Sequence, residues 1–378
     1  MEVLQDMGAF YQEAFGAEDC SSCAMKCAVA KWFALYYGTD SAAGLDHCLR
    51  LPYTVVRKLL RGVFAEYAAK GGDSRTQAVL DALPYGEAME LALIGGECYL
   101  KPVYQGRWQW RTVPRGSILV FARDHHGEPI DVGLTEKSAL GRQHFTLLER
   151  RSLDEKGLLT VTNRLFRSGS AQSLGREVPL KNHPAFAGLP QRYVYPVALG
   201  SVGLVRVKTP MLNCVDGSRE GVSVYAAAVE LMEAIAENEA QLKGEFRKGQ
   251  SRLVVSRDLL DRGQLADDLF VALDESPDAV GITIFSPELR QKAYLERQQA
   301  YLRAVENVIG LKRGLLSEVE AVDRTATEIT SSEGEYMTTL MELRRMWEQA
   351  ASRAVGLCAA LEQVKAGSVD FQWGDGVL

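Results

Sequence analysis

The chain lacks a basic surplus, and its sequence predicts neither a secretory leader nor a disulfide framework. Its 43 lysines and arginines stand against 49 aspartates and glutamates, a net charge of −6, so we expect no surface that grips duplex DNA tightly. Acidic residues occupy the N-terminus, where a signal peptide needs basic ones, and the most apolar stretch, 193–205, is too short to span a bilayer. Seven cysteines in 378 residues are an odd number, which favours a reducing, cytoplasmic compartment.

Enzymatic signatures are also missing from the sequence. There is no G-x-S-x-G, no H-E-x-x-H and no dinucleotide-binding pattern. The segment 244–251 approaches a phosphate-binding loop, but Gln250 stands where that motif requires lysine, and the segment ends a predicted helix instead of opening one. Asp124-His125-His126 precedes Gly127 and is best interpreted as a surface turn. We therefore predict no catalytic residues and no cofactor.

Three cysteines near the N-terminus are the candidate metal ligands. If their segment is helical, the i, i+3, i+7 spacing puts the thiols on one face, where a soft metal could bind, with His47-Cys48 completing the site. Zinc sites more often pair their ligands on knuckles, and cysteine is also a common small core residue, so we favour packing over metal binding. A zinc-binding enzyme is the alternative, testable by metal analysis. The three residues are Cys20, Cys23 and Cys27.

The first 210 residues predict an α+β region. Up to about residue 85, apolar residues recur every three or four positions, which is typical of amphipathic helices. Beyond Gly95-Gly96 the chain changes to short runs rich in Val, Tyr, Trp and Thr, separated by turn signals, which indicates an antiparallel sheet. The expected strands cover residues 98–103, 108–113, 118–122, 144–149, 159–165 and 193–197.

The rest of the chain returns to helical patterns. An apolar stripe that includes Tyr225, Met232 and Phe246 predicts a long helix from Gly221 to Gly249. A small unit follows, because short β-prone runs come next in place of a helical period. Its expected strands cover residues 252–256, 269–273 and 280–285.

Two further long helices are expected. Ser286-Pro287 is a typical helix start, with serine as N-cap and proline at the first position, so the second helix is predicted over 287–309. The third is predicted over 336–364, after capping-box patterns at Thr325 and Ser332, with a loose glycine-rich tail. Apolar residues of the second helix repeat every seven positions, as Tyr294, Tyr301 and Val308 and as Leu295, Leu302 and Ile309.

Two blocks of this region resemble the portal proteins of tailed bacteriophages with long non-contractile tails. The first reads KTPMLNCVDGSREGVSVY and continues through the first long helix to GEFRKGQSRLVV. The second reads FSPELRQKAYLERQQAYLRAVENVIGLKRGLLS and then VDRTATEITSSEGEYMTTL. Its IGL…G-x-L-S…TATEI run between long helices is the most characteristic part. GGECYLKPVYQGRWQWRTVP and HFTLLERRSL resemble the sheet region of the same family more loosely, so the resemblance extends over nearly the whole chain.

The resemblance implies an elongated α+β subunit with a wing, long stem helices, a small α/β clip and a long C-terminal helix. Family members continue further past the last long helix, so a short or missing crown is implied. By analogy the segments are the wing (1–220), first stem helix (221–250), clip (251–286), second stem helix (287–310), tunnel loop and return segment (311–334), and wing or crown helix with a short tail (335–378).

The resemblance also implies a function. Portal proteins form rings, usually of twelve subunits, around a channel at one capsid vertex, through which double-stranded DNA is packaged and ejected. The implied partners are further copies of the chain, the DNA, the terminase large subunit, head-completion or adaptor proteins and the major capsid protein. The implied location is the virion, after synthesis in the host bacterial cytoplasm, without membrane contact.

The implied site is the tunnel loop, which points at DNA in the channel. Weak phosphate contacts suit a conduit in which DNA slides, and a negatively charged ring discourages sticking. A head–tail adaptor ring is the alternative, but adaptors are usually shorter and lack the TATEI block. The channel cations are Lys312, Arg313 and Arg324, and the family motif is Thr325, Ala326, Thr327, Glu328 and Ile329.

Overall fold

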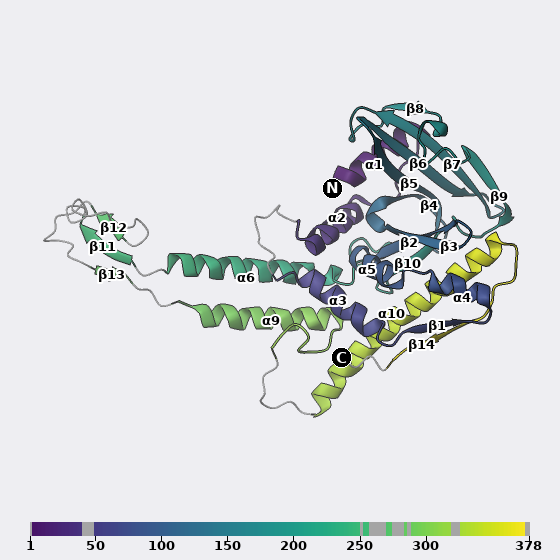
Figure 1. Cartoon of the computed structure of the whole chain (residues 1–378). Coiled ribbons are helices and arrows are strands. Elements are labelled where there is room, and N and C mark those ends of the chain that lie inside the picture. Colours follow the sequence, from purple (N-terminus) through teal and green to yellow (C-terminus); the bar gives the residue numbers. More distant parts are fainter. Residues whose placement is uncertain are drawn as a thin grey trace.

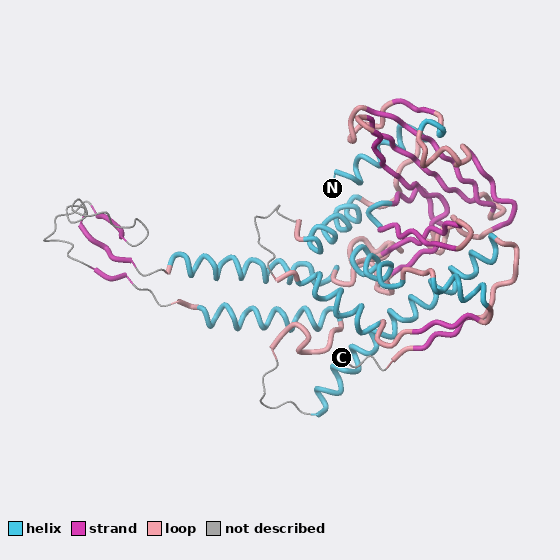
Figure 2. The backbone as a smooth tube through the Cα atoms, in the orientation of Figure 1, coloured by secondary structure: helices cyan, strands magenta, loops and turns pink. Residues whose placement is uncertain are grey.

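The computed structural model describes residues 2–39, 49–249, 252–256, 270–273, 283–285, 289–318 and 326–374. It contains helices and several antiparallel sheets, so the α+β class predicted from the sequence is confirmed. The molecule is elongated, with a broad head from which a two-helix arm projects (Figures 1 and 2). We call residues 229–309 the arm and the other described residues, apart from 310–318, the head.

The arm is a helical hairpin with a small sheet at its far end. Its helices, α6 (Val229–Lys248) and α9 (Gln291–Ile309), lie side by side and run in opposite directions (Figure 1). In the sheet, β11 (Arg252–Ser256) pairs in parallel with β12 (Phe270–Leu273) and antiparallel with β13 (Thr283–Phe285). The small strand unit expected between the two helices is therefore present.

The largest sheet of the head is antiparallel and carries a helix on one face. Its order is β4-β5-β6-β7-β8, and β9 also pairs with β7. Alternate residues of β7 are buried, as a sheet with one covered face requires. Helix α1 (Glu2–Phe15) covers it, and the Tyr11 hydroxyl donates to the Leu134 and Glu149 carbonyls at 2.7 and 2.9 Å. The strands are β4 (Ile118–Arg123), β5 (Pro129–Leu140), β6 (Gln143–Leu153), β7 (Leu158–Ser168), β8 (Arg176–Val178) and β9 (Arg192–Ala198).

Two smaller sheets complete the head. A three-stranded antiparallel sheet has the order β10-β2-β3, and a two-stranded ribbon pairs β1 with β14. Short helices pack between these sheets and the rest of the head. The strands are β1 (Ala68–Gly71), β2 (Glu97–Tyr104), β3 (Trp108–Pro114), β10 (Val205–Lys208) and β14 (Val369–Gln372), and the helices are α2 (Cys23–Tyr37), α3 (Leu51–Val63), α4 (Ser74–Asp81) and α5 (Tyr85–Gly95).

The main hydrophobic core joins the head helices to the near ends of both arm helices. Helix α10 (Ala326–Leu361) crosses this core, with Trp347 fully buried. The Tyr225 hydroxyl, also fully buried, donates to the Trp32 carbonyl at 2.8 Å. Helices α3 and α10 approach so closely that a Cβ at Gly62 would lie 2.4 Å from the Tyr336 hydroxyl. The arm is therefore rooted in the same core that holds the head together.

The expected first long helix starts later than the sequence indicated. Residues 221–225 form no helix, and a short 3₁₀ turn at Ala226–Ala228 precedes α6. The backbone amide of Val224 donates to the Leu93 carbonyl at 3.0 Å, and the Ser223 hydroxyl donates to the same oxygen at 3.0 Å. Bonds to α5 thus replace the helical bonds that residues after Gly221 would otherwise make.

The other two helices also differ from the prediction. Leu289 and Arg290 are not helical and α9 begins at Gln291, while Ser286-Pro287 lies outside the described residues. Helix α10 is continuous from Ala326 to Leu361, so the helix start predicted at Ser332 is wrong. A capping pattern is a local signal, and a helix that continues satisfies the same amides with backbone carbonyls.

The described part of the tail after α10, up to residue 374, contains a strand, contrary to the loose tail predicted from the sequence. Strand β14 pairs with β1 over four residues, and the ring of Trp373 lies 4.7 Å from that of Tyr67. The Trp373 indole N–H donates to a Glu348 oxygen at 2.7 Å.

Strands β5 and β10 were not predicted from the sequence. Their partners lie in other strands, and periodicity alone does not show them.

Candidate functional site: the arm and the loop that follows it

A buried amide joins the two helices of the arm. Asn238 of α6 has no exposed surface, and its Nδ2 donates to the Tyr294 carbonyl of α9 at 3.0 Å. Its Oδ1 accepts from Arg297 Nε at 2.8 Å. A buried amide with partners on the facing helix disfavours other registers, because a shifted helix would leave it unsatisfied. Asn238 therefore sets how α6 and α9 face one another.

Further polar pairs, one exposed and one partly buried, accompany this contact along the arm. Arg290 makes a two-pronged ion pair with Glu245, at 3.0 and 2.9 Å. Gln298 donates to Glu239 at 2.5 Å. These bonds keep the helices together near the far end of the arm, where the main core no longer reaches.

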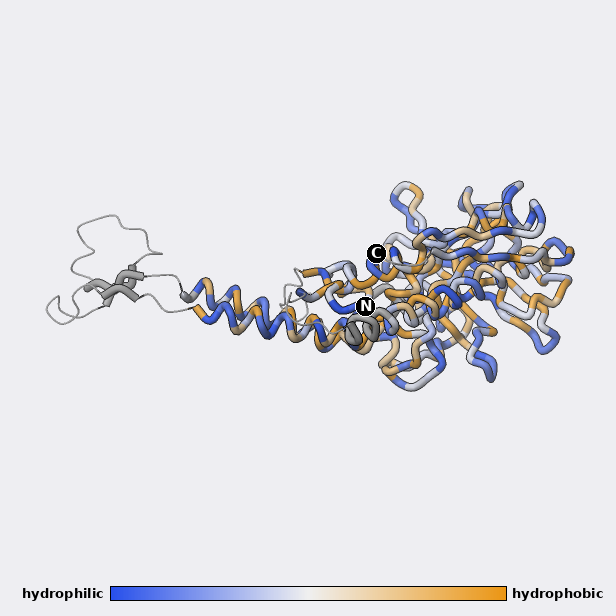
Figure 3. The backbone as a smooth tube through the Cα atoms, turned by 90° about the horizontal axis from the view of Figure 1, so that it is seen from below, coloured by the Kyte–Doolittle hydropathy of each residue, from blue (hydrophilic) through white to orange (hydrophobic). Residues whose placement is uncertain are grey.

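The arm leaves large apolar side chains exposed. The heptad repeat seen in the sequence is only half buried, because Leu302 and Ile309 pack into the core while Leu295 and Val308 are 41% and 49% exposed. Figure 3 shows polar and apolar residues interleaved along the arm. The exposed apolar residues come from both helices of the arm and from the residues just before α9. The residues are Phe246, Leu289, Leu295 and Val308.

The loop after α9 folds back onto that helix. Gly310 ends the helix in the left-handed conformation, with φ 75°. The Thr339 hydroxyl of α10 donates to the Gly310 carbonyl at 3.2 Å. The side chain of Glu306, only 2% exposed, accepts hydrogen bonds from the loop, among them one from the Ser317 hydroxyl at 2.7 Å. These contacts explain the glycine and serine of the IGL…G-x-L-S pattern.

The predicted channel cations and the residues of the family motif fall into three groups in the structure. Lys312 is half-buried and Arg313 is exposed at the start of the loop. Arg324 and Thr325 lie outside the described residues. Residues 326–329, the remainder of the family motif, form the first turn of α10. These four motif residues therefore lie at the start of the long helix.

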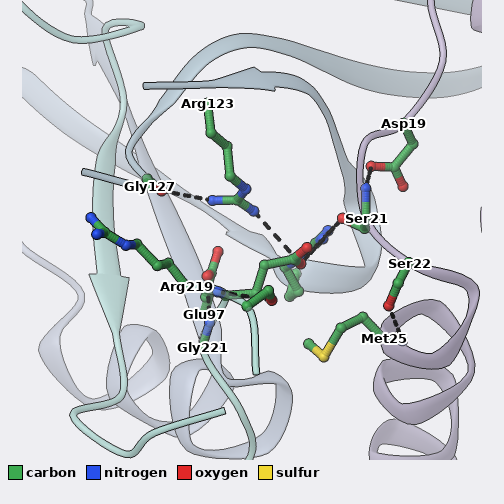
Figure 4. Close-up of polar contacts among 12 residues, drawn as sticks. Asp19, Ser21, Ser22, Met25, Glu97, Arg123, Gly127, Arg219 and Gly221 are labelled. Carbon is green, nitrogen blue, oxygen red and sulfur yellow. Dashed lines mark hydrogen bonds and ion pairs between the residues drawn. The ribbon is translucent and has the colours of Figure 1, made fainter. Parts of the chain in front are cut away.

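A buried ionic cluster anchors the segment that leads into α6. Glu97 is fully buried, forms an ion pair with Arg206 and accepts the Gly221 amide at 2.7 Å. Arg115 donates to Glu220 at 2.7 Å. We call these four charged residues the root cluster. Figure 4 shows Glu97 beside Gly221, with Arg123 and Ser21 nearby.

The electrostatics of the root cluster favour ionised carboxylates. Burial alone would raise the pKa of Glu97, but Arg206, Arg115 and Arg123 hold it well below its ordinary value. Arg206 correspondingly has its pKa raised by Glu97 against the opposing effect of burial. The cluster ties β2, β10 and residues 220–221 together, so it fixes the point from which the arm starts.

The three N-terminal cysteines do not form the expected arrangement. Helix α2 begins at Cys23 with Ser22 as N-cap, so Cys20 precedes the helix and does not share its face. All three thiols are exposed, so the core-packing interpretation is wrong as well. His47 and Cys48 lie outside the described residues. Within the described part of the chain, no three His, Cys, Asp or Glu side chains are grouped as metal ligands.

Sequence reasoning missed Glu306 and Asn238, the two residues that organise the arm and its loop. Both are polar residues that line a predicted apolar stripe, and this mismatch was the available signal. In the structure both are almost completely buried.

Comparison with known proteins adds no assignment. No family model matches the chain, and no curated protein matches it. Among the described helices, none combines the length and the apolar character needed to cross a bilayer.

Proposed function

We propose that the chain is a portal-type subunit that assembles into a ring around a DNA channel. The observation that carries the proposal is the arm, a helical hairpin that leaves the head, exposes apolar residues and ends in a small sheet. This matches the stem and clip implied by the portal-like blocks of the sequence. In the proposal the chain performs no catalysis, and a separate terminase drives the DNA.

The exposed apolar residues of the arm support ring assembly. A single arm cannot bury Leu295 and Val308, whereas neighbouring arms in a closed ring can cover each other's faces. The contact would be heterologous, since one face of each arm meets a different face of the next, and such contacts close into rings. The head would then contact the capsid, and the sheet β11–β13 would face the terminase and head-completion proteins.

The loop after α9 supports the channel role. Exposed Arg313 and half-buried Lys312 lie next to each other where the resemblance places the tunnel loop. The net charge of −6 per subunit keeps the assembled channel from holding DNA strongly. A few cations in a negative channel give weak contacts, which allow DNA to slide.

Electron microscopy of the purified protein, combined with mass photometry, tests the proposal. We expect rings of about twelve subunits with a central hole, the number implied by the resemblance. Leu295→Glu should prevent ring formation because it charges the arm face, while Leu140→Glu, at a 52% exposed position of the head, should not. Monomers across the accessible concentration range, or particles without a hole, would contradict the proposal.

The channel role has a separate test. Rings of the Lys312→Ala/Arg313→Ala variant should assemble normally but package DNA abnormally in a reconstituted packaging reaction. Normal packaging by these rings would show that the two cations do not contact DNA.

A further inference from the structure

The first half of the loop after α9 is held by one carboxylate. Glu306 Oε1 accepts three backbone amides, from Gly314 at 3.1 Å, Leu316 at 2.5 Å and Ser317 at 3.0 Å. Its Oε2 accepts the Ser317 hydroxyl at 2.7 Å. Four donors thus converge on a side chain that is 2% exposed. Bonds to a carboxylate are stronger than bonds between neutral groups, so this is the dominant polar contact of the loop.

Helix stability does not explain a glutamate at this position. Glu306 lies in the last turn of α9, and a negative charge there opposes the helix macrodipole. Burial of a carboxylate is also unfavourable unless donors satisfy it. All four donors come from residues 314–317. The loop therefore supplies the hydrogen bonds that offset the cost of burying the Glu306 carboxylate.

The hydrogen bonds of Glu306 close residues 306–317 into a short ring that contains the two candidate channel cations. Lys312 and Arg313 lie between Glu306 and the bonded residues 314–317, so their backbone has a fixed position relative to α9. Just beyond this ring, the Glu318 amide donates to Gln299 Oε1 at 2.8 Å, which attaches the loop to α9 a second time. Gly314, with φ 91°, supplies the left-handed turn that brings the amides round to the carboxylate.

We infer that Glu306 is the positioning residue of the loop after α9. It holds Lys312 and Arg313 at a defined place at the end of α9, from which they contact DNA phosphates. The part of this inference that concerns DNA rests on the proposed function. The part that concerns the loop does not. A DNA channel needs cations that make weak and equal contacts from every subunit. A loop whose first residues have a fixed geometry places these cations identically in each subunit.

Hydrogen–deuterium exchange of the full chain tests the loop directly. In Glu306→Leu, exchange of the peptide that covers 311–318 should accelerate by about ten-fold or more, because three amides lose a charged acceptor. Peptides from β6 and β7 should not change. Glu306→Gln should accelerate exchange by less than Glu306→Leu, since its amide oxygen can still accept the three amides but without the charge. The matched control is Glu296→Leu, the same substitution at a 67% exposed position of the same helix. Unchanged exchange at 311–318 in Glu306→Leu would overturn the inference.

A second variant covers the case in which Glu306→Leu does not fold. Ser317→Ala removes the one hydroxyl that donates to Oε2 and leaves the three amides in place. Its exchange should increase at 316–318 by less than that of Glu306→Leu. If Ser317→Ala and Glu306→Gln both match wild type while Glu306→Leu is unfolded, Glu306 supports the fold only and the inference fails.

The salt dependence of DNA association by assembled rings separates positioning from simple support of the fold. With a blunt-ended duplex as the probe, Lys312→Ala/Arg313→Ala should flatten the dependence of affinity on salt. Glu306→Leu should flatten it in the same direction, and Glu306→Gln should restore it. A faster-exchanging loop with no change of salt dependence in either variant would contradict the proposed DNA contact while leaving the positioning of the loop intact.

Discussion

The head and the arm use opposite means to hold their elements together. The head buries a large aromatic and aliphatic core, with Trp347, Tyr225 and Tyr11 fully enclosed, and its buried charges are paired. Away from its root, the arm relies on a buried amide, exposed polar pairs and few apolar contacts, and it leaves apolar side chains in solvent. A large apolar core therefore holds the head together, whereas polar contacts hold the outer part of the arm together.

The difference predicts which substitutions lower the stability of the isolated subunit. Removing a buried group from the head creates a cavity or an unpaired charge, both of which lower the free energy of unfolding of the isolated subunit. Removing an exposed apolar group from the arm should leave the stability of the isolated subunit almost unchanged. Three predictions test this contrast.

The largest effect is expected in the core of the head. Trp347→Ala should lower the free energy of unfolding by about 3–5 kcal/mol, because a fully buried indole leaves a cavity. Phe246→Ala, at a 41% exposed arm position, should change it by less than about 0.5 kcal/mol. Urea unfolding of the isolated subunit measures both. Equal losses in the two variants would break the contrast between head and arm.

The next effect concerns the buried charges of the head at low pH. Burial would raise the pKa of Glu149, but Arg151 and Lys101 lower it to about 2, from 4.5 in the unfolded chain. The ionised form is thus favoured by folding, so its stabilisation is complete above the unfolded pKa and is lost as the pH falls towards the folded one. We expect the head to lose a few kcal/mol of stability over this range.

Glu149→Gln provides the control for this acid effect. It should be less stable than wild type at neutral pH, because Arg151 and Lys101 lose their partner, and its stability should fall less on acidification. Urea unfolding at a series of pH values measures both slopes. An identical slope in the variant would assign the acid sensitivity to other carboxylates.

The smallest effect is expected inside the arm. Asn238→Ala should cost about 1–3 kcal/mol of local stability, because the Tyr294 carbonyl and Arg297 each lose a buried partner. Exchange of amides in α6 and α9 should accelerate, with no change in β6 and β7. Gln241→Ala, which removes only an exposed bond to Arg297, is the matched control. Acceleration that extends into the head would show that the arm and the head unfold as one unit.

Much of the architecture follows from local patterns in the sequence. Strands such as 159–165 and 144–149 were predicted by their β-branched and aromatic content, and both lie within longer strands of the sheet. The long helices were predicted from apolar periodicity, and only their starts were misplaced. At Gly221 the error arose because bonds to Glu97 and Leu93 compete with the helix. Such partners lie far away in the sequence and give no local signal.

The candidate site could be predicted only in part. The IGLKRGLLS block correctly located a loop with adjacent cations at the end of a helix. The place of Glu306 within an apolar stripe was a signal, but its role was not predicted, because a glutamate in a helix normally faces solvent and its partners lie in the loop. Cys20, Cys23 and Cys27 show the opposite error, since their spacing implied a shared face that exists only if all three lie in one helix.

The sequence by itself determined the class of fold, the order of its helical and strand-rich parts and the absence of a basic surplus. These properties depend on composition and on periods of two and 3.6 residues, which are local. Only the tertiary structure decided which polar residues are buried, where the arm is anchored and which apolar residues remain exposed. Glu306, Asn238 and the root cluster acquire their roles from partners on other elements, and those partners meet only when the chain packs.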